Sequence, residues 1–398
     1  MNTADHLHLL DQYAAHNYSP VAMVAARAQG AWVWDVEGKK YFDMLSAYGA
    51  INFGHSNERF KKRAIEQLDR MTMISRAFMN DQMGPFCKDL AELCGLEMVL
   101  PMNSGAEAVE TAIKAARRWG YQVKKVEPDK AEIICMEGNF SGRTTTIISF
   151  STVAAYKEGF GPLTPGFVIA PFGNYEAIER LITKNTVAIM IEPIQGEGGV
   201  IIPPDGYLKK VRELCTARQV LFIADEVQSG LCRSGDLFAC DYEQVKPDLY
   251  CLGKSLGGGI VPISAVVGTA AVLGVFNPGS HGSTFGGYSF ACAVAREVIA
   301  YIREEKPHLR ARELGAHLVS RLRAMNSPYI CEVRGRGLMV GADIKPEYGK
   351  AKKFCEKLAA KGVLTKDTRD QTIRFTPPLV SSKEDLDWAI DRVAEVFI

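Results

Sequence analysis

The sequence predicts an α/β protein in which a large domain with a mainly parallel central sheet, covered by helices, is joined to a smaller α+β domain. Its 398 residues correspond to two or three domains at about 150 residues each. Short apolar runs alternate with helical segments through the middle of the chain, as in parallel sheets covered on both faces. Beyond Gly287 strands and helices follow one another on a smaller scale.

The large sheet is predicted from five short apolar runs, at residues 98–102, 132–136, 187–191, 221–224 and 249–252. Helical spacing of apolar residues predicts a helix over 105–121 and another around 208–214. Residues 257–276 carry no charge over about the length of a membrane span. Their three glycines and Pro262 instead predict a buried turn, a strand and a helix.

The small domain is predicted from a long helix over 291–323, strands at 330–334 and 338–344, a helix over 350–361, a strand containing Arg374 and a terminal helix. Near the N-terminus, 32–35 and 40–43 read as a hairpin around Glu37-Gly38, and the pattern alone allows it to join either domain. We assign residues 1–47 to a segment associated with the small domain, 48–290 to the large domain and 291–398 to the small domain.

The composition excludes several classes of protein. Apolar residues make up 47% and charged residues 23%, which excludes wholesale disorder. The net charge of +1 lacks the basic excess expected of a nucleic-acid-binding protein. The ten cysteines form no C-x-x-C pair and the seven histidines no metal-binding cluster, so we expect reduced thiols and no metal. Residues 1–18 lack the pattern of a secretory signal or import leader, so we expect a cytoplasmic protein with no membrane partner.

Polar residues follow four of the predicted strands, at the sheet edge where ligands gather in open α/β folds. They are Asn103, Ser104 and Gly105; Glu192 and Glu197; Asp225 and Gln228; and Gly253 and Lys254. A lysine just beyond an apolar strand could form a Schiff base, or it could be a solvated lysine in a surface turn. Gly253-Lys254-Ser255 also matches the end of a P-loop, but Asp248 stands where that motif requires glycine.

Asp225 and the Ser104 region favour a pyridoxal phosphate (PLP) site. A carboxylate that ends a buried strand needs a partner, and PLP enzymes use such an acid to keep the ring nitrogen protonated. The alternative is a helix N-cap. Ser104-Gly105-Ala106-Glu107 is a capping box whose free N–H groups could also hold a phosphate. Ser283 and Thr284 offer further phosphate donors.

Five motifs resemble those of the class III, or ω-, aminotransferases, and within that class the ornithine aminotransferases. They read Pro101-Met102-Asn103-Ser104-Gly105, Gly138-Asn139-Phe140-Ser141-Gly142-Arg143-Thr144, Glu192-Pro193-Ile194-Gln195-Gly196-Glu197, Asp225-Glu226-Val227-Gln228-Ser229-Gly230 and Leu252-Gly253-Lys254. The similarity extends from about Asn17 to the C-terminus. It implies PLP-dependent transferase fold type I and a homodimer with shared active sites. It also implies δ-transamination of L-ornithine with 2-oxoglutarate, giving glutamate 5-semialdehyde and glutamate, in arginine, ornithine and proline metabolism.

The resemblance also implies a role for each cofactor residue. Lys254 joins the cofactor covalently and shuttles a proton, and Asp225 pairs with the pyridinium. Gln228 bonds the phenolic oxygen, while Phe140 and Val227 cover the two ring faces. The phosphate is held by Ser104, Gly105, Ala106 and Ser283, with Thr284 arriving from the other subunit.

The substrate residues follow from the same resemblance. Arg143 binds the α-carboxylate of ornithine, a task that suits the bidentate guanidinium of arginine. Tyr18 and Tyr48 orient the ornithine molecule. Arg374 binds the α-carboxylate of glutamate, and Glu197 neutralises Arg374 while ornithine is bound. Glu192 completes the substrate set. Outside the family Arg143 reads as a surface arginine, Glu197 as a loop acid and Tyr48 as a core residue.

One departure and two alternatives remain. The family usually continues Asn-Pro after Gly286-Gly287, whereas this chain has Tyr288-Ser289, so the turn beside Thr284 should differ. Another ω-aminotransferase, acting on N-acetylornithine or 4-aminobutyrate, is the nearest alternative activity. A PLP-binding protein without turnover is the alternative from another class.

Overall fold

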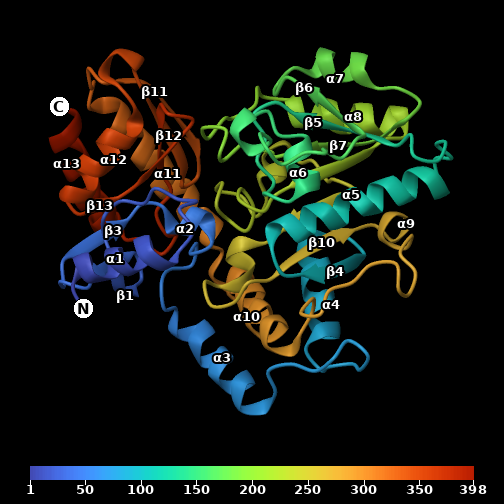
Figure 1. Cartoon of the computed structure of the whole chain (residues 1–398), viewed down its shortest axis with the longest axis horizontal. Helices are drawn as coiled ribbons and strands as arrows, with labels where there is room; N and C mark the ends of the chain where they lie inside the picture. The colour runs from blue at the N-terminus through green and yellow to red at the C-terminus, as the bar shows by residue number, and fades with distance from the viewer.

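The computed structural model describes residues 1–398, which form three sheets with helices packed around them (Figure 1). The largest sheet has seven strands in the order β4-β10-β9-β8-β7-β5-β6. Strand β10 is antiparallel to both of its neighbours and every other pair is parallel, so the predicted mainly parallel sheet is confirmed. Its strands are β4 (Met98–Met102), β5 (Glu132–Met136), β6 (Phe167–Ala170), β7 (Thr186–Ile191), β8 (Leu221–Asp225), β9 (Leu249–Leu252) and β10 (Ser264–Gly268).

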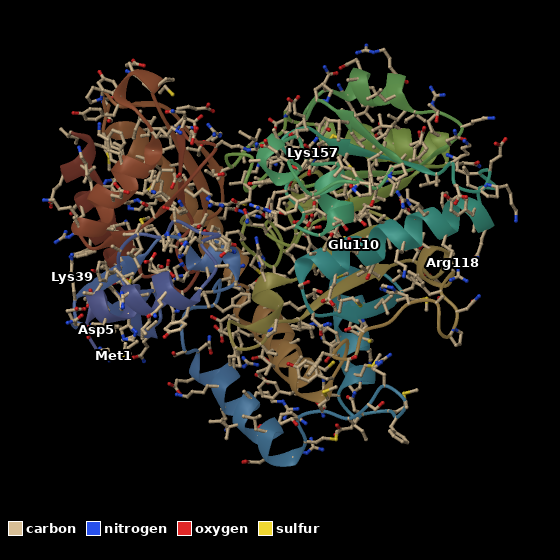
Figure 2. The ribbon with its side chains drawn as sticks, viewed as in Figure 1. Met1, Asp5, Lys39, Glu110, Arg118 and Lys157 are labelled. Atoms are coloured by element: carbon tan, nitrogen blue, oxygen red, sulfur yellow. The ribbon has the colours of Figure 1, made fainter.

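Strands β7, β8 and β9 are buried on both faces, which explains their continuous apolar sequences. Successive residues point to opposite faces, so Phe222 packs into one hydrophobic core and Ile223 into another. Helix α8 (Tyr207–Arg218) contributes Val211 to the first core, and α5 (Gly105–Gln122) contributes Ala112 to the second. The half-buried side of α5 carries Glu110 and Arg118, which are labelled along it in Figure 2.

The predicted single helix over 291–323 is wrong. The chain forms α10 (Ser289–Glu305) and α11 (Pro307–Ala324), with Lys306 between them in the left-handed region at φ 48°. Pro307 is the first residue of α11, where its missing N–H costs nothing. Proline therefore starts a second helix here, since it cannot continue the one before it.

Two smaller sheets lie together on one side of the molecule, beside the helices near the C-terminus (Figure 1). The first is antiparallel and contains β11 (Ile330–Arg336), β12 (Met339–Ile344), β15 (Thr372–Phe375) and β14 (Lys366–Thr368), in that order. The second contains β1 (Ala25–Gln29), β2 (Trp32–Asp35), β3 (Lys40–Asp43) and β13 (Val363–Leu364). The hairpin predicted around Glu37-Gly38 is confirmed, and β3 pairs in parallel with β13.

The other elements connect and cover these sheets. None of the helices has both the length and the apolar character needed to cross a membrane. They are α1 (Thr3–Tyr13), α2 (Ser46–Gly49), α3 (Glu58–Arg70), α4 (Met83–Cys94), α6 (Thr145–Ser149), α7 (Tyr175–Leu181), α9 (Ala270–Leu273), α12 (Ala351–Ala360), α13 (Lys383–Phe397) and the 3₁₀ turns η1 (Ala154–Tyr156), η2 (Ala239–Glu243), η3 (Lys254–Gly257) and η4 (Pro346–Tyr348).

Candidate active site

Three chemically distinctive residues come together where the adjacent strands β7, β8 and β9 end. Glu192 follows β7, Asp225 ends β8, and Lys254 follows β9 after one glycine. They line one cavity of about 190 Å³, the strand-end cavity, so the sequence correctly predicts that Asp225 and Lys254 lie together. Its other lining residues are Gly105, Ala106, Phe140, Ser141, Gly142, Val227 and Gln228.

Asp225 is a buried carboxylate held by hydrogen bonds alone. Its Oδ2 accepts a hydrogen bond from the Ser141 hydroxyl at 2.7 Å, and its Oδ1 accepts one from the Val227 N–H at 3.2 Å. No cation of the chain forms an ion pair with it, and burial raises its pKa. A cationic group placed in the cavity would therefore gain strongly from this carboxylate.

Glu192 lies beside Asp225, on the same side of the cavity. One oxygen accepts a hydrogen bond from the Phe140 N–H at 2.8 Å and the other accepts one from the Gly196 N–H at 3.4 Å. Burial and the neighbouring charge of Asp225 raise the pKa of Glu192 to about 8. The carboxyl group thereby fixes the main chain on which Phe140 sits.

The Lys254 amine has unusual surroundings. Its pKa is lowered to about 8: burial is the main cause and Arg374 adds to it, while Glu197, Asp225 and Glu192 oppose the shift. Its backbone is in the left-handed region, at φ 47°, which a residue with a side chain adopts only under constraint. A lysine with a lowered pKa has a substantial neutral, nucleophilic fraction near neutral pH.

The first turn of α5 forms an anion-binding end of the cavity. The predicted capping box is confirmed: Ser104 Oγ accepts from the Glu107 N–H at 3.2 Å, and Glu107 accepts from the Ser104 N–H at 2.7 Å. The N–H groups of Gly105 and Ala106 have no acceptor within the helix, and they line the cavity. A side chain at Gly105 would meet Val227 Cγ1 at 2.8 Å, so only glycine fits.

A second cavity, of about 390 Å³, adjoins the same helix end and includes Ser104, Gly105 and Lys254. Ser283 lies close by, because its hydroxyl accepts a hydrogen bond from Asn103 Nδ2 at 2.7 Å. Thr284 is exposed and lines neither cavity of this chain. The structure therefore brings Ser283, but not Thr284, to the anion-binding end.

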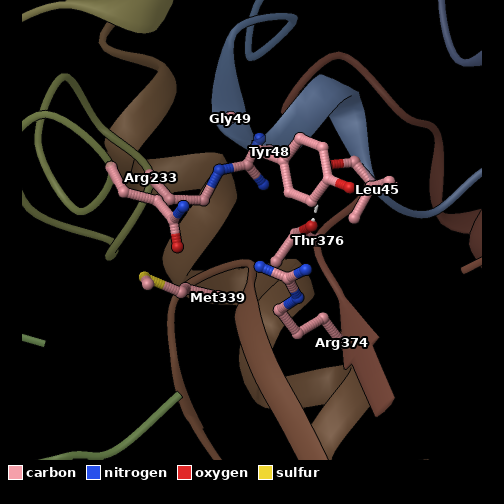
Figure 3. Close-up of a pocket in the computed structure, with 8 residues that line it drawn as sticks. Leu45, Tyr48, Gly49, Arg233, Met339, Arg374 and Thr376 are labelled. Atoms are coloured by element: carbon pink, nitrogen blue, oxygen red, sulfur yellow. Dashed lines mark hydrogen bonds between the residues drawn. The ribbon is translucent and has the colours of Figure 1, made fainter. Parts of the chain in front are cut away.

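A further pocket, shown in Figure 3, lies next to the strand-end cavity and shares Gln228 with it. We call it the carboxylate-binding pocket after the role proposed for it below; its other lining residues are Leu45, Tyr48, Gly49, Arg233, Met339, Arg374 and Thr376. Arg374, buried on β15, forms an ion pair with Glu197. Gln228 Nε2 donates to the same Glu197 oxygen over 3.5 Å, and the guanidinium lies 4.9 Å from the Tyr48 ring centroid. Burial raises the pKa of Glu197, but Arg374 and Lys254 outweigh it, so the net shift is downward.

Tyr48 reaches this pocket through an irregular turn. Ser46, Ala47 and Tyr48 all have positive φ, which turns the chain tightly before Gly49. The Ser46 hydroxyl donates to the Thr376 carbonyl at 2.6 Å, and the Thr376 N–H donates to the Met44 carbonyl at 2.7 Å. Tyr48 is therefore fixed against the strand that carries Arg374.

Three predicted substrate residues, Glu197, Arg143 and Tyr18, are not among those that line these cavities, although Glu197 bonds to Arg374 and Gln228, which are. Arg143 is exposed, with its guanidinium 3.6 Å from the Tyr156 ring centroid and 5.4 Å from that of Phe140. Tyr18 is 78% exposed and lines none of the three cavities described above. Sequence reasoning missed Ser141 as the partner of Asp225, although its position after Phe140 in a predicted motif was a usable signal.

Sequence reasoning also missed a clamp on Glu197. The Thr368 hydroxyl donates to the Glu197 carbonyl at 2.6 Å, and the Arg369 guanidinium donates to the same carbonyl at 3.3 Å and to the Gly138 carbonyl at 3.0 Å. Thr368 is the last residue of β14, which pairs with the strand of Arg374, and Arg369 follows it. No sequence motif marks the clamp, because its bonds end on main-chain oxygens.

Known proteins resemble the chain over its whole length. The family described as aminotransferase class-III matches residues 13–397. An ornithine aminotransferase from Geobacillus sp. (strain WCH70) is 54% identical over 99% of this chain and 98% of its own. The ornithine aminotransferase of Bacillus subtilis (strain 168) is 51% identical over 98% and 97%.

Solved structures are also similar to the chain over its whole length. The ornithine aminotransferase from Toxoplasma gondii ME49 superimposes with a TM-score of 0.98 at 43% identity, over 100% of this chain and 95% of that one. An acetylornithine aminotransferase from Elizabethkingia anophelis reaches 0.91 at 40% identity, over 100% and 99%. A further Toxoplasma gondii ornithine aminotransferase structure is described with partial occupancy of PLP at its active site. The predicted fold type I is therefore confirmed, and the chain belongs to the class-III aminotransferases.

Proposed function

We propose that the chain transfers the δ-amino group of L-ornithine to 2-oxoglutarate with PLP as cofactor, giving glutamate 5-semialdehyde and glutamate. The observation that carries the proposal is the Glu197–Arg374 ion pair beside Tyr48, next to the cavity that contains Lys254. In such an ion pair the carboxylate can either neutralise the guanidinium or move away and leave it free to bind an anion. That is what an enzyme needs when one substrate presents a carboxylate to the pocket and the other does not.

The strand-end cavity suits PLP. Asp225 offers a buried carboxylate without a cation, and the free N–H groups of Gly105 and Ala106 offer a phosphate site. Lys254 supplies an amine whose pKa is lowered to about 8. When bound, PLP supplies an electron sink for the negative charge that develops on the substrate carbon.

Each cavity residue then has a task. Asp225 would hold a proton on the ring nitrogen, with Ser141 and the Val227 N–H fixing its two oxygens. Phe140 and Val227 would cover the ring, and Gln228 would donate to the phenolic oxygen. Lys254 would hold the cofactor between turnovers and carry the proton at the reacting carbon.

The substrates use the carboxylate-binding pocket differently. With ornithine bound, Arg143 takes the α-carboxylate, Tyr48 and Tyr18 orient the chain, and Glu197 keeps Arg374 neutralised. With glutamate bound, Glu197 releases Arg374, which then takes the α-carboxylate. We assign Glu192 to holding the Phe140 and Gly196 main chain around these substrates.

We also propose a cytoplasmic homodimer with shared active sites. Apolar side chains remain exposed in and near the 390 Å³ cavity, which is lined by Ile260. Thr284, exposed in its own chain, would complete the phosphate site of the partner. Within each chain we divide the residues into an N-terminal segment 1–47, a large domain 48–290 and a small domain 291–398; the pairing of β3 with β13 supports joining the first to the last.

The test compares amino donors. We expect kcat/KM to be higher for ornithine than for N-acetylornithine and 4-aminobutyrate, with absorbance changes of the cofactor in each half-reaction. Arg143→Ala should impair the ornithine half-reaction more than the glutamate one, and Arg374→Ala the reverse. A better donor than ornithine would reassign the substrate, and a spectrum unmoved by every amine would point to a PLP-binding protein without turnover.

A further inference from the structure

A further cavity, lined by three arginines, lies outside the candidate active site described above. We call it the arginine groove; it measures about 560 Å³ and shares no residue with the other cavities discussed. One face of α11, the end of β11 and the segment 234–242 form its walls. It is lined by Ser234, Asp236, Tyr242, Arg312, Gly315, Ala316, Val319, Ser320, Arg323, Gly335, Arg336 and Gly337.

The charges of the groove are unbalanced. Three arginines line it, and Asp236 is its one acidic residue. Arg312 pairs with Asp236, while Arg323 donates twice to the Val333 carbonyl, at 2.8 and 3.2 Å. Arg336 reaches out to Asp205, at 3.2 Å, an aspartate whose side chain is 84% exposed. Three guanidinium groups thus share one lining carboxylate and one solvated carboxylate.

Each arginine uses only part of its guanidinium in hydrogen bonds, so each retains an N–H donor without a partner. Arg312 bonds through Nε and Nη2, Arg323 through Nε and Nη2, and Arg336 through Nη2. None of the three donates through Nη1, and Nη1 of Arg336 is buried without a partner. Tyr242 fixes the plane of the Arg336 guanidinium, which lies 3.5 Å from its ring centroid.

A second buried donor points to a missing acceptor. Ser234 is 4% exposed, and its hydroxyl has no hydrogen-bond partner. Buried polar groups are nearly always paired, because leaving one unpaired costs the desolvation of that group. Ser234 and Arg336 both line the groove, and their unpaired donors lie just beneath its surface, each with less than 1 Å² of accessible area.

The walls of the groove are already fixed in place. A Cβ on Gly315 would lie 1.8 Å from the Gly337 carbonyl oxygen, so α11 and the turn after β11 meet main chain to main chain. The Leu338 N–H donates to the Arg233 carbonyl at 3.2 Å, and Arg233 Nη1 donates back to the Leu338 carbonyl at 2.9 Å. A ligand would meet a pre-organised site, which lowers the ordering cost of binding.

We propose that the arginine groove binds a compact oxyanion carrying two or more negative charges, a phosphate group or a dicarboxylate. Its oxygens would accept hydrogen bonds from Nη1 of Arg312 and Arg323 and, after small side-chain rotations, from Nη1 of Arg336 and from the Ser234 hydroxyl. Charge-assisted hydrogen bonds to arginine are the strong ones, and guanidinium groups match both phosphate and carboxylate geometry. The ligand would join α11 to the segment 234–236 and so stabilise the contact between them.

The test measures binding to the PLP-loaded enzyme, with cofactor absorbance followed to show that PLP stays bound. Inorganic phosphate and succinate are titrated separately at constant ionic strength with sodium chloride as balance, by calorimetry and by thermal melting. We expect saturable binding and a rise in Tm for at least one anion. Binding of phosphate alone would support the site and identify a phosphate group as its ligand. Binding of succinate alone would support the site and identify a dicarboxylate as its ligand.

Matched variants locate the binding. Arg323→Gln and Arg336→Gln should each weaken Kd about tenfold or more, as expected for a charged hydrogen bond, and Ser234→Ala by a smaller factor. Arg180→Gln, an exposed arginine on α7 with no ion pair, should leave Kd unchanged. Should Arg336→Gln fail to fold, Arg323→Gln and Ser234→Ala still decide the question. Absence of saturable binding by both anions, or equal Kd values in all variants, would overturn the proposal.

Discussion

The strand-end cavity and the carboxylate-binding pocket share Gln228, yet they balance charge in opposite ways. In the first, Asp225 and Glu192 are buried without an ion pair, and burial raises both pKa values. In the second, Glu197 pairs with Arg374 and has a lowered pKa. In the first region the lining cation, Lys254, forms an ion pair with neither carboxylate, so a cationic group of a ligand can still pair with them, whereas the second must separate its own ion pair to bind an anion.

The difference indicates which ligand remains bound through many turnovers and which is exchanged in each turnover. A cavity that lacks its counter-charge gains most from a permanently bound cation and loses most when that group leaves. A pocket with an internal ion pair loses less on emptying, because Glu197 replaces the departing carboxylate. We therefore expect cofactor retention to depend on the first region and substrate selection on the second.

The largest expected effect concerns Lys254, which lines the strand-end cavity. Lys254→Ala should lower both half-reactions by more than about 10³-fold, since general acid–base catalysis alone contributes about 10²–10⁴-fold. The measurement is single-turnover absorbance with ornithine and with glutamate, with circular dichroism to check folding. Lys130→Ala, an exposed lysine in a loop, is the matched control. Sustained multiple turnover in Lys254→Ala would remove Lys254 from the chemistry.

The next effect tests whether the strand-end cavity depends on charge. Asp225→Asn keeps an acceptor for the Ser141 hydroxyl but removes the carboxylate, so activity should fall by about 10²-fold, as when one electrostatic contact to the transition state is lost. PLP should also leave faster on dialysis, followed by absorbance. Wild-type retention of PLP in this variant would mean that hydrogen bonding, and not charge, holds the ring.

The carboxylate-binding pocket should respond in a different parameter. Glu197→Gln leaves Arg374 without its counter-charge, so Arg374 should capture α-carboxylates at all times. The ratio of kcat/KM for glutamate to that for ornithine should rise by about tenfold, the size of one charged hydrogen bond. Half-reaction kinetics measure it. If both values fall equally, the two substrates do not use this ion pair differently.

A smaller effect should come from the clamp on Glu197. Thr368→Val removes the hydroxyl that donates to the Glu197 carbonyl, one neutral hydrogen bond of about 0.5–1.5 kcal/mol. The same ratio should rise by a few fold. Thr216→Val, which removes a hydroxyl bonded to the Arg212 carbonyl on α8, is the control and should leave the ratio unchanged. An unchanged ratio in Thr368→Val would show that the clamp does not affect selection.

The smallest expected effect is on the pH dependence of stability, and it comes from a buried carboxyl group outside the ligand site. Burial raises the pKa of Glu226, the neighbour of Asp225, to about 7, although it bonds to Ser229 and Cys240 rather than facing the cavity. The folded state thus binds this proton more tightly than the unfolded state, so the stabilisation is complete below about pH 4.5 and disappears as pH rises through 7.

Glu226→Gln should therefore flatten the fall of Tm between pH 4.5 and 7, measured on holoenzyme by thermal melting. The exposed Glu176→Gln on α7 serves as control and should keep the wild-type slope. An unaltered slope in Glu226→Gln would assign the pH dependence to other groups, with Asp225 and Glu192 the next to test.

The sequence predicted the strand-end cavity better than the carboxylate-binding pocket, for a physical reason. The carboxyl ends of parallel strands share one edge, so Glu192, Asp225 and Lys254 had to be neighbours once the strands were recognised. Tyr48 and Arg374 meet through a left-handed turn and a distant strand, which no local pattern encodes, and only family resemblance paired them. The break at Lys306 was missed because the apolar pattern continues across it, although Pro307 marked it.

The pairing of β3 with β13 joins the beginning of the chain to a strand near its end. At a synthesis rate of about 5–20 residues per second, the first strands emerge from the ribosome tens of seconds before their partner exists. During that interval the edge of β3 is open to other chains, as any unpaired strand edge is. Biosynthesis, rather than the finished enzyme, is therefore the stage at which we expect this protein to need a chaperone.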